Sequence, residues 1–151
     1  MTITYLTGDA TEPVGPGLKI IPHICNDMGA WGAGFVLDIS KKWKNPETHY
    51  RSMTVRHLGD ISIHVVESDI VVVNIIGQHG ITRSKLGTPP IRYKAVRKAL
   101  KHINSIIEPY ATLHMPRIGC GLAGGKWEKI EKIIKDTISV DVYVYDLPVT
   151  H

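Results

Sequence analysis

The chain has 151 residues, 43% of them hydrophobic and 21% charged, so it is long enough to bury a core without disulfides or structural metals. No stretch approaches the roughly 18 uninterrupted apolar residues of a membrane span, and the first residues lack the basic and apolar regions of a signal peptide. The formal charge of +4 fits either an ordinary solvated surface or a protein that binds anions. We therefore predict one domain over residues 1–151 that is soluble and cytoplasmic, with the nucleus also open, does not bind membranes, and is monomeric.

Cysteine and histidine usage argues against a metal centre. Cys25 and Cys120 are the only cysteines, and their spacing suggests neither a disulfide framework nor a zinc ribbon. The eight histidines are scattered, with no pair four residues apart on an expected helix. We predict no metal ligands and no cofactor.

Apolar periodicity predicts strands alternating with helices. Strands are expected at residues 3–6, 18–25, 61–66, 70–76, 112–115 and 140–145. Helices are expected from Phe35 to Trp43, weakly at residues 46–55, from Tyr93 after the helix-starting Pro89-Pro90, and from Trp127. His64, between two apolar residues, is expected to face solvent on an alternating strand.

The run Ile70-Val-Val-Val-Asn-Ile-Ile76 is nearly continuous in apolar residues, which a strand requires when both faces of its sheet are covered. Helices must therefore flank the sheet on both sides. The order of elements predicts an α/β protein, a three-layer α/β/α domain with a mixed, largely parallel central sheet.

A glycine-rich segment, residues 115–127, lies between an expected strand and an expected helix. Glycines there let backbone N–H groups approach an anion, and the helix that follows supplies further unpaired donors. A Walker A loop is excluded, because Cys120 stands where its first glycine belongs and Trp127 follows Lys126. The letters from Gly119 to Gly124 fit a dinucleotide fingerprint, but they occur too near the C-terminus for that fold to follow. A purely structural turn is the other alternative.

Residues that directly follow the strands should meet at one edge of the sheet, where open α/β folds bind ligands. These segments are 8–10, 26–34, 77–80, 116–125 and 146–147. Two of them are glycine-rich and each opens a helix, so together they could hold the two halves of a diphosphate.

This set of segments resembles the macrodomain family, which binds ADP-ribose. The resemblance spans the chain and is carried by Thr7-Gly-Asp9, by His23-Ile-Cys-Asn26 leading into Gly29-Ala-Trp-Gly-Ala-Gly34, by Pro116-Arg-Ile-Gly-Cys-Gly-Leu122 and by Val144-Tyr-Asp-Leu147. It is similar to two branches, one with the terminal ADP-ribose protein glycohydrolase and one with small yeast ADP-ribose 1''-phosphate phosphatases. It implies the macrodomain fold and ADP-ribose or ADP-ribose 1''-phosphate as the bound partner.

The resemblance also implies roles for individual residues. Asp9 would recognise the adenine amine, with Ala10 and Leu147 beside the base, Asp146 would be a further ligand contact, and Asn26 would face the distal ribose. For Asp9 an Asx turn, and for Asn26 a satisfied buried amide, are the alternatives. The rest of the expected ligand contacts lie in the two glycine loops: Trp31, Gly32, Ala33, Gly34 and Phe35 in the first, and Pro116, Arg117, Ile118, Gly119, Cys120, Gly121, Leu122 and Ala123 in the second.

The expected catalytic residues depart from the glycohydrolase pattern. Gln78 and Ala123 stand where that branch has a lysine nucleophile and an aspartate, and neither can perform those steps. We expect Asn26 and Gln78 to hold a water, with His79 or Asp27 as acid or base. Cys120 is expected to contribute its backbone N–H instead of its sulfur.

Three functions remain open. The leading hypothesis is a hydrolase, a phosphatase that converts ADP-ribose 1''-phosphate to ADP-ribose and phosphate. The second is an ADP-ribosyl hydrolase that removes ADP-ribose from modified protein or nucleic acid. The third is a binding module for ADP-ribose without turnover.

Overall fold

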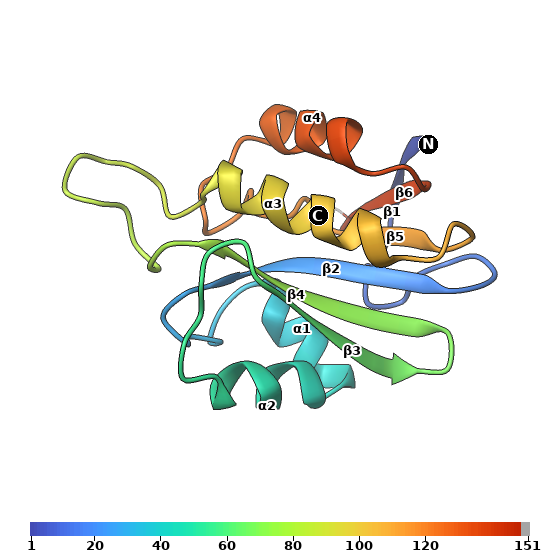
Figure 1. Cartoon of the computed structure of the whole chain (residues 1–151), viewed down its shortest axis with the longest axis horizontal. Helices are drawn as coiled ribbons and strands as arrows, with labels where there is room; N and C mark the ends of the chain where they lie inside the picture. Colours follow the sequence, from blue (N-terminus) through green and yellow to red (C-terminus); the bar gives the residue numbers. More distant parts are fainter. Residues whose placement is uncertain (149–151) are drawn as a thin grey trace.

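The structure of the protein, a computed structural model, describes residues 1–148 as a six-stranded sheet with helices on both faces (Figure 1). The strands are β1 (Ile3–Thr7), β2 (Lys19–Asn26), β3 (Ile61–Glu67), β4 (Ile70–Gln78), β5 (Thr112–Met115) and β6 (Val142–Asp146). The helices are α1 (Phe35–Lys42), α2 (Asn45–Ser52), α3 (Tyr93–Ile106) and α4 (Trp127–Thr137). None of the helices within residues 1–148 combines the length and apolar character that crossing a bilayer requires.

The strand order is β1-β6-β5-β2-β4-β3, and every neighbouring pair is parallel except β3 with β4. The predicted three-layer α/β/α fold with a mixed, largely parallel sheet is therefore confirmed. Because five strands run the same way, their carboxyl ends meet at one edge, from which the long 79–92 loop projects (Figure 1).

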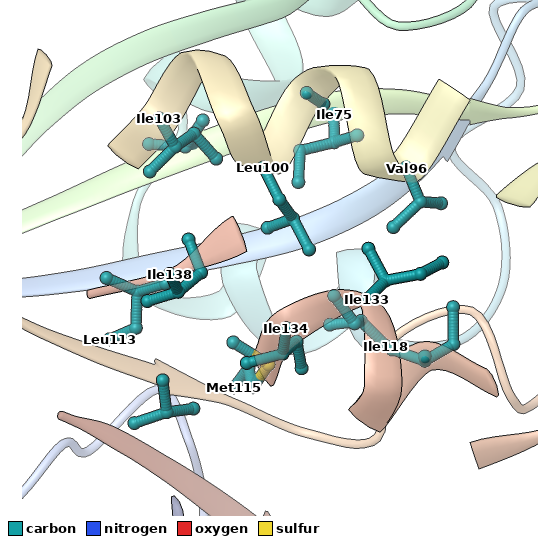
Figure 2. Close-up of a cluster of buried hydrophobic side chains, with 14 of the residues drawn as sticks. Ile75, Val96, Leu100, Ile103, Leu113, Met115, Ile118, Ile133, Ile134 and Ile138 are labelled. Atoms are coloured by element: carbon teal, nitrogen blue, oxygen red, sulfur yellow. The ribbon is translucent and has the colours of Figure 1, made fainter. Parts of the chain in front are cut away.

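Two hydrophobic clusters, one on each face, hold the layers together. The larger lies under α3 and α4, where Val96, Leu100 and Ile134 are fully buried against strand residues such as Leu113 and Met115 (Figure 2). The smaller lies under α1 and α2. Burying one such aliphatic side chain stabilises the fold by about 1.5–3 kcal/mol, so these clusters fix the sheet that positions the loops.

Element boundaries follow the sequence-based expectations closely, with shifts at the ends. The strand expected at 70–76 continues to Gln78, and the strand expected from residue 140 begins at Val142. The weak expectation of a helix near residues 46–55 is confirmed by α2, in which Pro46 occupies the first turn.

The expected orientation of β3 was wrong. Ile63 and Val65 are 52% and 68% exposed, whereas His64 turns towards α2, with its ring centroid 4.9 Å from that of His49. β3 is an edge strand, so its apolar face extends past the cover of α3, while α2 covers the other face. Burial, with a smaller contribution from His49, lowers the pKa of His64.

Candidate functional site

The carboxyl ends of the parallel strands bring together segments that are distant in sequence. Following the sheet from β1 to β4, these ends carry Asp9, Asp146, the loop after Met115, Asn26 and Gln78. The ends of β1 and β4 are four strand spacings apart, which is about 19 Å. An elongated ligand could therefore lie across the edge and meet each segment in turn.

The first glycine loop, residues 27–34, is organised from below by Asn26. The Asn26 Nδ2 donates to the carbonyl oxygen of Ala30 at 2.7 Å, and its Oδ1 accepts from the N–H groups of Met28 and Ala30 at 2.9 and 3.2 Å. The Tyr50 hydroxyl lies 2.7 Å from the same Oδ1 and accepts from the Gly29 N–H. Asn26 therefore shapes the loop, although it also lines part of the cleft.

The second glycine loop, residues 116–125, closes on itself. The Gly125 N–H donates to the Gly119 carbonyl at 2.8 Å, and Gly119 and Gly124 have φ angles of 72° and 74°. A Cβ on Gly119 would lie 2.6 Å from the Ile91 Cδ1, and one on Gly125 would lie 2.4 Å from the Gly119 oxygen. Tight packing of the loop itself thus requires glycine at these positions.

Gly121 and Gly32 are different, because neither their backbone conformation nor the packing around them requires glycine. Neither has a positive φ, and a Cβ built on either would meet no atom within 4 Å. Both residues line the cleft, Gly121 from the second loop and Gly32 from the first. Glycines that line a cleft without an internal need for glycine are expected where a bound group requires close access to backbone N–H groups.

The cleft between the loops consists of two adjoining cavities of about 240 and 300 Å³ that share Ile24, Ala33, Val36, Gln78 and Leu122. The first, towards β5, is also lined by His23, Gly34, Phe35, Pro116, Arg117, Ile118, Gly119, Gly121 and Ala123. The second, towards β4, is also lined by Cys25, Asn26, Ala30, Gly32 and Ile81. We call them the β5 cavity and the β4 cavity.

Gln78 is the one expected catalytic side chain that lines both cavities. It ends β4, and its Nε2 donates to the Gly80 carbonyl oxygen at 3.0 Å. That bond fixes the amide plane at the wall shared by the cavities.

Asp27 and His79 pair with each other and line neither cavity. The His79 Nδ1 lies 2.7 Å from one Asp27 carboxylate oxygen, and the other oxygen accepts from the Gly80 N–H at 2.9 Å. Burial acts to raise the pKa of Asp27, but these hydrogen bonds and His79 outweigh it and lower that pKa. The carboxylate is therefore ionised at neutral pH and orients the imidazole beside Gln78.

The expected adenine end lies where β1 and β6 pair, outside the two cavities. Asp9 Oδ1 accepts from the Thr11 N–H at 2.8 Å and from its hydroxyl at 2.7 Å, so the Asx turn that was the alternative role for Asp9 is present, and these bonds use only one of the two carboxylate oxygens. Ala10 is buried and Leu147 is 68% exposed. The Gly8 N–H donates to the Asp146 carbonyl and ties the two segments together.

Arg117 and Asp146 form an ion pair beside this end. The Arg117 Nε and Nη2 donate to the two Asp146 oxygens at 2.8 and 3.0 Å, and the guanidinium carbon lies 5.2 and 5.4 Å from the centres of the Tyr5 and Trp127 rings. The hydrogen bond from Arg117 lowers the pKa of Asp146. Arg117 is thus held at the outer wall of the β5 cavity.

Two expected ligand residues have other surroundings. Trp31 is buried in the core under α1 and α2, where its Nε1 donates to the Ser40 hydroxyl at 2.7 Å, and it does not line the cleft. Cys120 is likewise absent from both cavity linings, and burial raises the pKa of its thiol to about 11, so the sulfur is a neutral thiol. Within residues 1–148, His, Cys, Asp and Glu side chains form no group of three that could bind a metal ion.

Sequence reasoning missed several apolar residues of the cleft, namely Ile24, Cys25, Ala30, Val36 and Ile81. The first four resemble core residues, so nothing in their pattern separates cleft from core. Ile81 lies in the long 79–92 loop, whose length was the available signal.

Comparisons with known proteins identify the family. A macrodomain protein from Streptomyces coelicolor has a solved structure that is 42% identical, with a TM-score of 0.80 over 95% of this chain and 98% of that one. The chain belongs to the macrodomain family. A protein of unknown function from Bacteroides thetaiotaomicron is 53% identical, with a TM-score of 0.89 over 95% and 98% of the two chains. No protein-family profile matches.

Curated relatives of this macrodomain are more distant. Mouse chromodomain-helicase-DNA-binding protein 1-like is 26% identical over 97% of this chain, which spans only 18% of that protein. An ADP-ribose 1''-phosphate phosphatase from Lodderomyces elongisporus is 23% identical over 97% of this chain and 100% of its own length.

Proposed function

We propose that this macrodomain binds ADP-ribose along the cleft and hydrolyses the bond between the anomeric carbon of the distal ribose, C1'', and its substituent. The observation that carries the proposal is the pair Gly32 and Gly121, which face the cleft from two loops although their own backbone and packing do not require glycine. The diphosphate would lie between them and accept hydrogen bonds from backbone N–H groups.

The order of the segments gives the ligand a direction. The adenine amine would donate to the unoccupied oxygen of Asp9, at the ends of β1 and β6. The diphosphate would cross the β5 cavity, and the distal ribose would occupy the β4 cavity beside Gln78. C1'' would then lie near the opening formed by exposed Ile81 and Leu122.

Hydrolysis needs a positioned water and a group that accepts its proton. Gln78, fixed by its bond to the Gly80 carbonyl, would hold the water at the wall of the β4 cavity. The His79 imidazole, oriented by Asp27, lies outside the cavity lining, so it would accept the proton through a second water. The water oxygen bonds to C1'', the bond to the substituent breaks, and the proton passes to the leaving atom. Asn26 would act by holding the 27–34 loop.

The nature of the β4 cavity favours an ADP-ribosyl group attached to a larger molecule. No lysine or arginine among residues 1–148 lines this cavity, whereas a phosphate monoester carries up to two negative charges. Its mouth is apolar, since Ile81 and Leu122 are 48% and 72% exposed. We therefore propose first an ADP-ribosyl hydrolase that releases ADP-ribose from a modified protein or nucleic acid.

The phosphatase is the second candidate, and the curated relatives support it. Full-length coverage of a yeast ADP-ribose 1''-phosphate phosphatase at 23% identity favours a substrate that carries phosphate on C1'', and the bond that breaks is then the one between phosphorus and oxygen. Backbone N–H groups of the 27–34 loop would then have to stabilise the phosphate without a cationic side chain. In this reaction water attacks phosphorus, and the C1'' oxygen stays with the sugar.

Two parallel assays decide between the candidates. Micromolar protein is incubated with ADP-ribosylated protein or DNA and, separately, with ADP-ribose 1''-phosphate, and the released ADP-ribose and phosphate are quantified. We expect release of ADP-ribose from the macromolecule, and a roughly hundredfold lower kcat with little change in KM for Gln78→Ala. Leu86→Ala, at a 95% exposed position of the same loop, is the matched control.

Each outcome has a definite reading. Phosphate release alone identifies the phosphatase. Binding of free ADP-ribose with no turnover of any of these substrates identifies a non-catalytic binding module. Full activity in Gln78→Ala would contradict the proposed role of Gln78 in holding the attacking water.

A further inference from the structure

A third cavity, which we call the basic recess, lies beyond the second glycine loop and apart from the cleft. Its volume is about 500 Å³, and it is lined by Thr88, Pro89, Ile91, Arg92, Tyr93, Gly124, Lys126 and Lys129. It shares no residue with either cavity of the cleft. A ligand in the recess would therefore not compete directly with one in the cleft.

The charges of the recess are uncompensated. Arg92, Lys126 and Lys129 line it without an acidic residue, and none of the three forms an ion pair within the described part of the chain. The Arg92 Nη1 donates only to backbone carbonyls, that of Pro89 at 2.6 Å among them, so the guanidinium is held in place with its charge intact.

Lysines one to two turns further along α4 provide a contrast. Lys132 pairs with Asp136 at 3.4 Å, and Lys135 pairs with Glu131 at 3.3 Å. Positive charge on α4 is therefore balanced towards its C-terminal end and unbalanced at the recess.

Two helix ends add to the positive potential. α3 begins at Tyr93 and α4 begins at Trp127, so the N-termini of both helices adjoin the recess. The Tyr93 hydroxyl accepts from the Lys126 N–H at 2.9 Å, and the Lys129 ammonium lies 5.1 Å from the centre of the Tyr93 ring. These contacts fix the two helix ends, with their cations, on the same side.

Further cations without an ion pair lie on α3 and in the 79–92 loop, the two elements whose ends line the recess. Lys94, Lys98 and Lys101 form a stripe on the exposed face of α3, opposite its buried residues. The 79–92 loop carries Arg83 and Lys85, and an Arg83 nitrogen would be 3.4 Å from a Cβ on Gly124, a lining residue of the recess. The ion pairs among residues 1–148 include none of these five side chains.

We propose that the basic recess binds the phosphodiester backbone of a nucleic acid. A free phosphate would use only the recess, whereas a polymer with regularly spaced phosphates also matches the cations that extend from it along α3 and the 79–92 loop. A concave site with side chains from two helices and two loops suits a strand more than the flat surface of a membrane. Contacts to the backbone predict binding that is strongly salt-dependent and largely independent of sequence.

The test compares two double variants with the same loss of charge. Lys126→Gln/Lys129→Gln removes unpaired cations of the recess, and Lys132→Gln/Lys135→Gln removes paired cations of the same helix. Fluorescence anisotropy with a labelled oligonucleotide of mixed sequence measures affinity between 25 and 150 mM salt, about the range in which such contacts weaken steeply. We expect the recess variant to bind about tenfold more weakly at low salt, with the slope of log K against log salt lowered by about 1.4 for a single strand.

The control variant should weaken binding less than the recess variant does, since its lysines are paired with acidic residues and do not line the recess. Both variants should bind free ADP-ribose as the unaltered protein does, which separates this inference from the proposed reaction. Absence of oligonucleotide binding, or equal weakening in both variants, would overturn the proposal. Binding of inorganic phosphate alone, or of vesicles with anionic lipid in preference to the oligonucleotide, would also overturn it.

Discussion

The Gly121→Ala variant tests whether ligand binding, and not folding, requires glycine at this position. The new methyl group would meet no protein atom within 4 Å and would occupy a backbone conformation open to alanine, so folding does not suffer. Replacing glycine at such a position stabilises a protein by about 0.4–1 kcal/mol, because the unfolded chain loses freedom. For a chain of this size the melting temperature should rise by about 1–4 °C.

The same methyl group should obstruct the diphosphate. Gly121 lines the β5 cavity, and displacing a phosphate from even one charge-assisted backbone hydrogen bond costs about 1.5–3 kcal/mol. That cost corresponds to a loss of roughly 10- to 100-fold in affinity for ADP-ribose. Isothermal calorimetry measures the affinity, and thermal unfolding of the same samples measures the stability.

Gly119→Ala is the control with the opposite expectation for stability. Its positive φ and a Cβ only 2.6 Å from Ile91 predict a marked fall in melting temperature. If Gly121→Ala binds ADP-ribose with unchanged affinity, or if it is destabilised like Gly119→Ala, the reasoning about the cleft-facing glycines is refuted.

Three other predictions concern buried groups and the adenine end. Tyr50→Phe removes the hydroxyl that binds Asn26, so the free energy of unfolding should fall by about 1–2 kcal/mol. The affinity for ADP-ribose should fall with it, and unchanged values of both would contradict the role of Tyr50 in supporting the 27–34 loop. Burial lowers the pKa of His23 and of His114 to about 4, below the value of about 6.5 in the unfolded chain. The stability that is present above about pH 6.5 should therefore be lost as the pH falls towards 4. A melting temperature that does not change from pH 7.5 to 5 would contradict this. Asp9→Asn keeps an oxygen for the Asx turn but offers the adenine amine a donor, so calorimetry should find roughly tenfold weaker binding at unchanged melting temperature, and unaltered affinity would remove Asp9 from the site.

The architecture was predictable because it follows from short sequence patterns of apolar residues and glycines. The continuous apolar run of β4 requires a sheet covered on both faces, and glycines after β2 and β5 mark the loops that open helices. The shared edge then follows from strand direction alone, which is why Gln78 and the two glycine loops could be brought together before any coordinates.

Side-chain direction was harder to predict, because it depends on contacts between distant segments. His64 turns inward because α2 covers one face of an edge strand, and the alternation of β3 does not say which face that is. Trp31 sits in a glycine loop, yet the pocket beside Ser40 buries it. Ile24 and Val36 line the cleft although their pattern matches that of core residues.

The structure of this macrodomain crystallised with ADP-ribose tests the central claim most directly. We predict the adenine beside Asp9, the diphosphate between the loops that contain Gly32 and Gly121, and the distal ribose next to Gln78. Well-formed crystals with an empty cleft at millimolar ADP-ribose, or with the ligand bound elsewhere, would contradict the account.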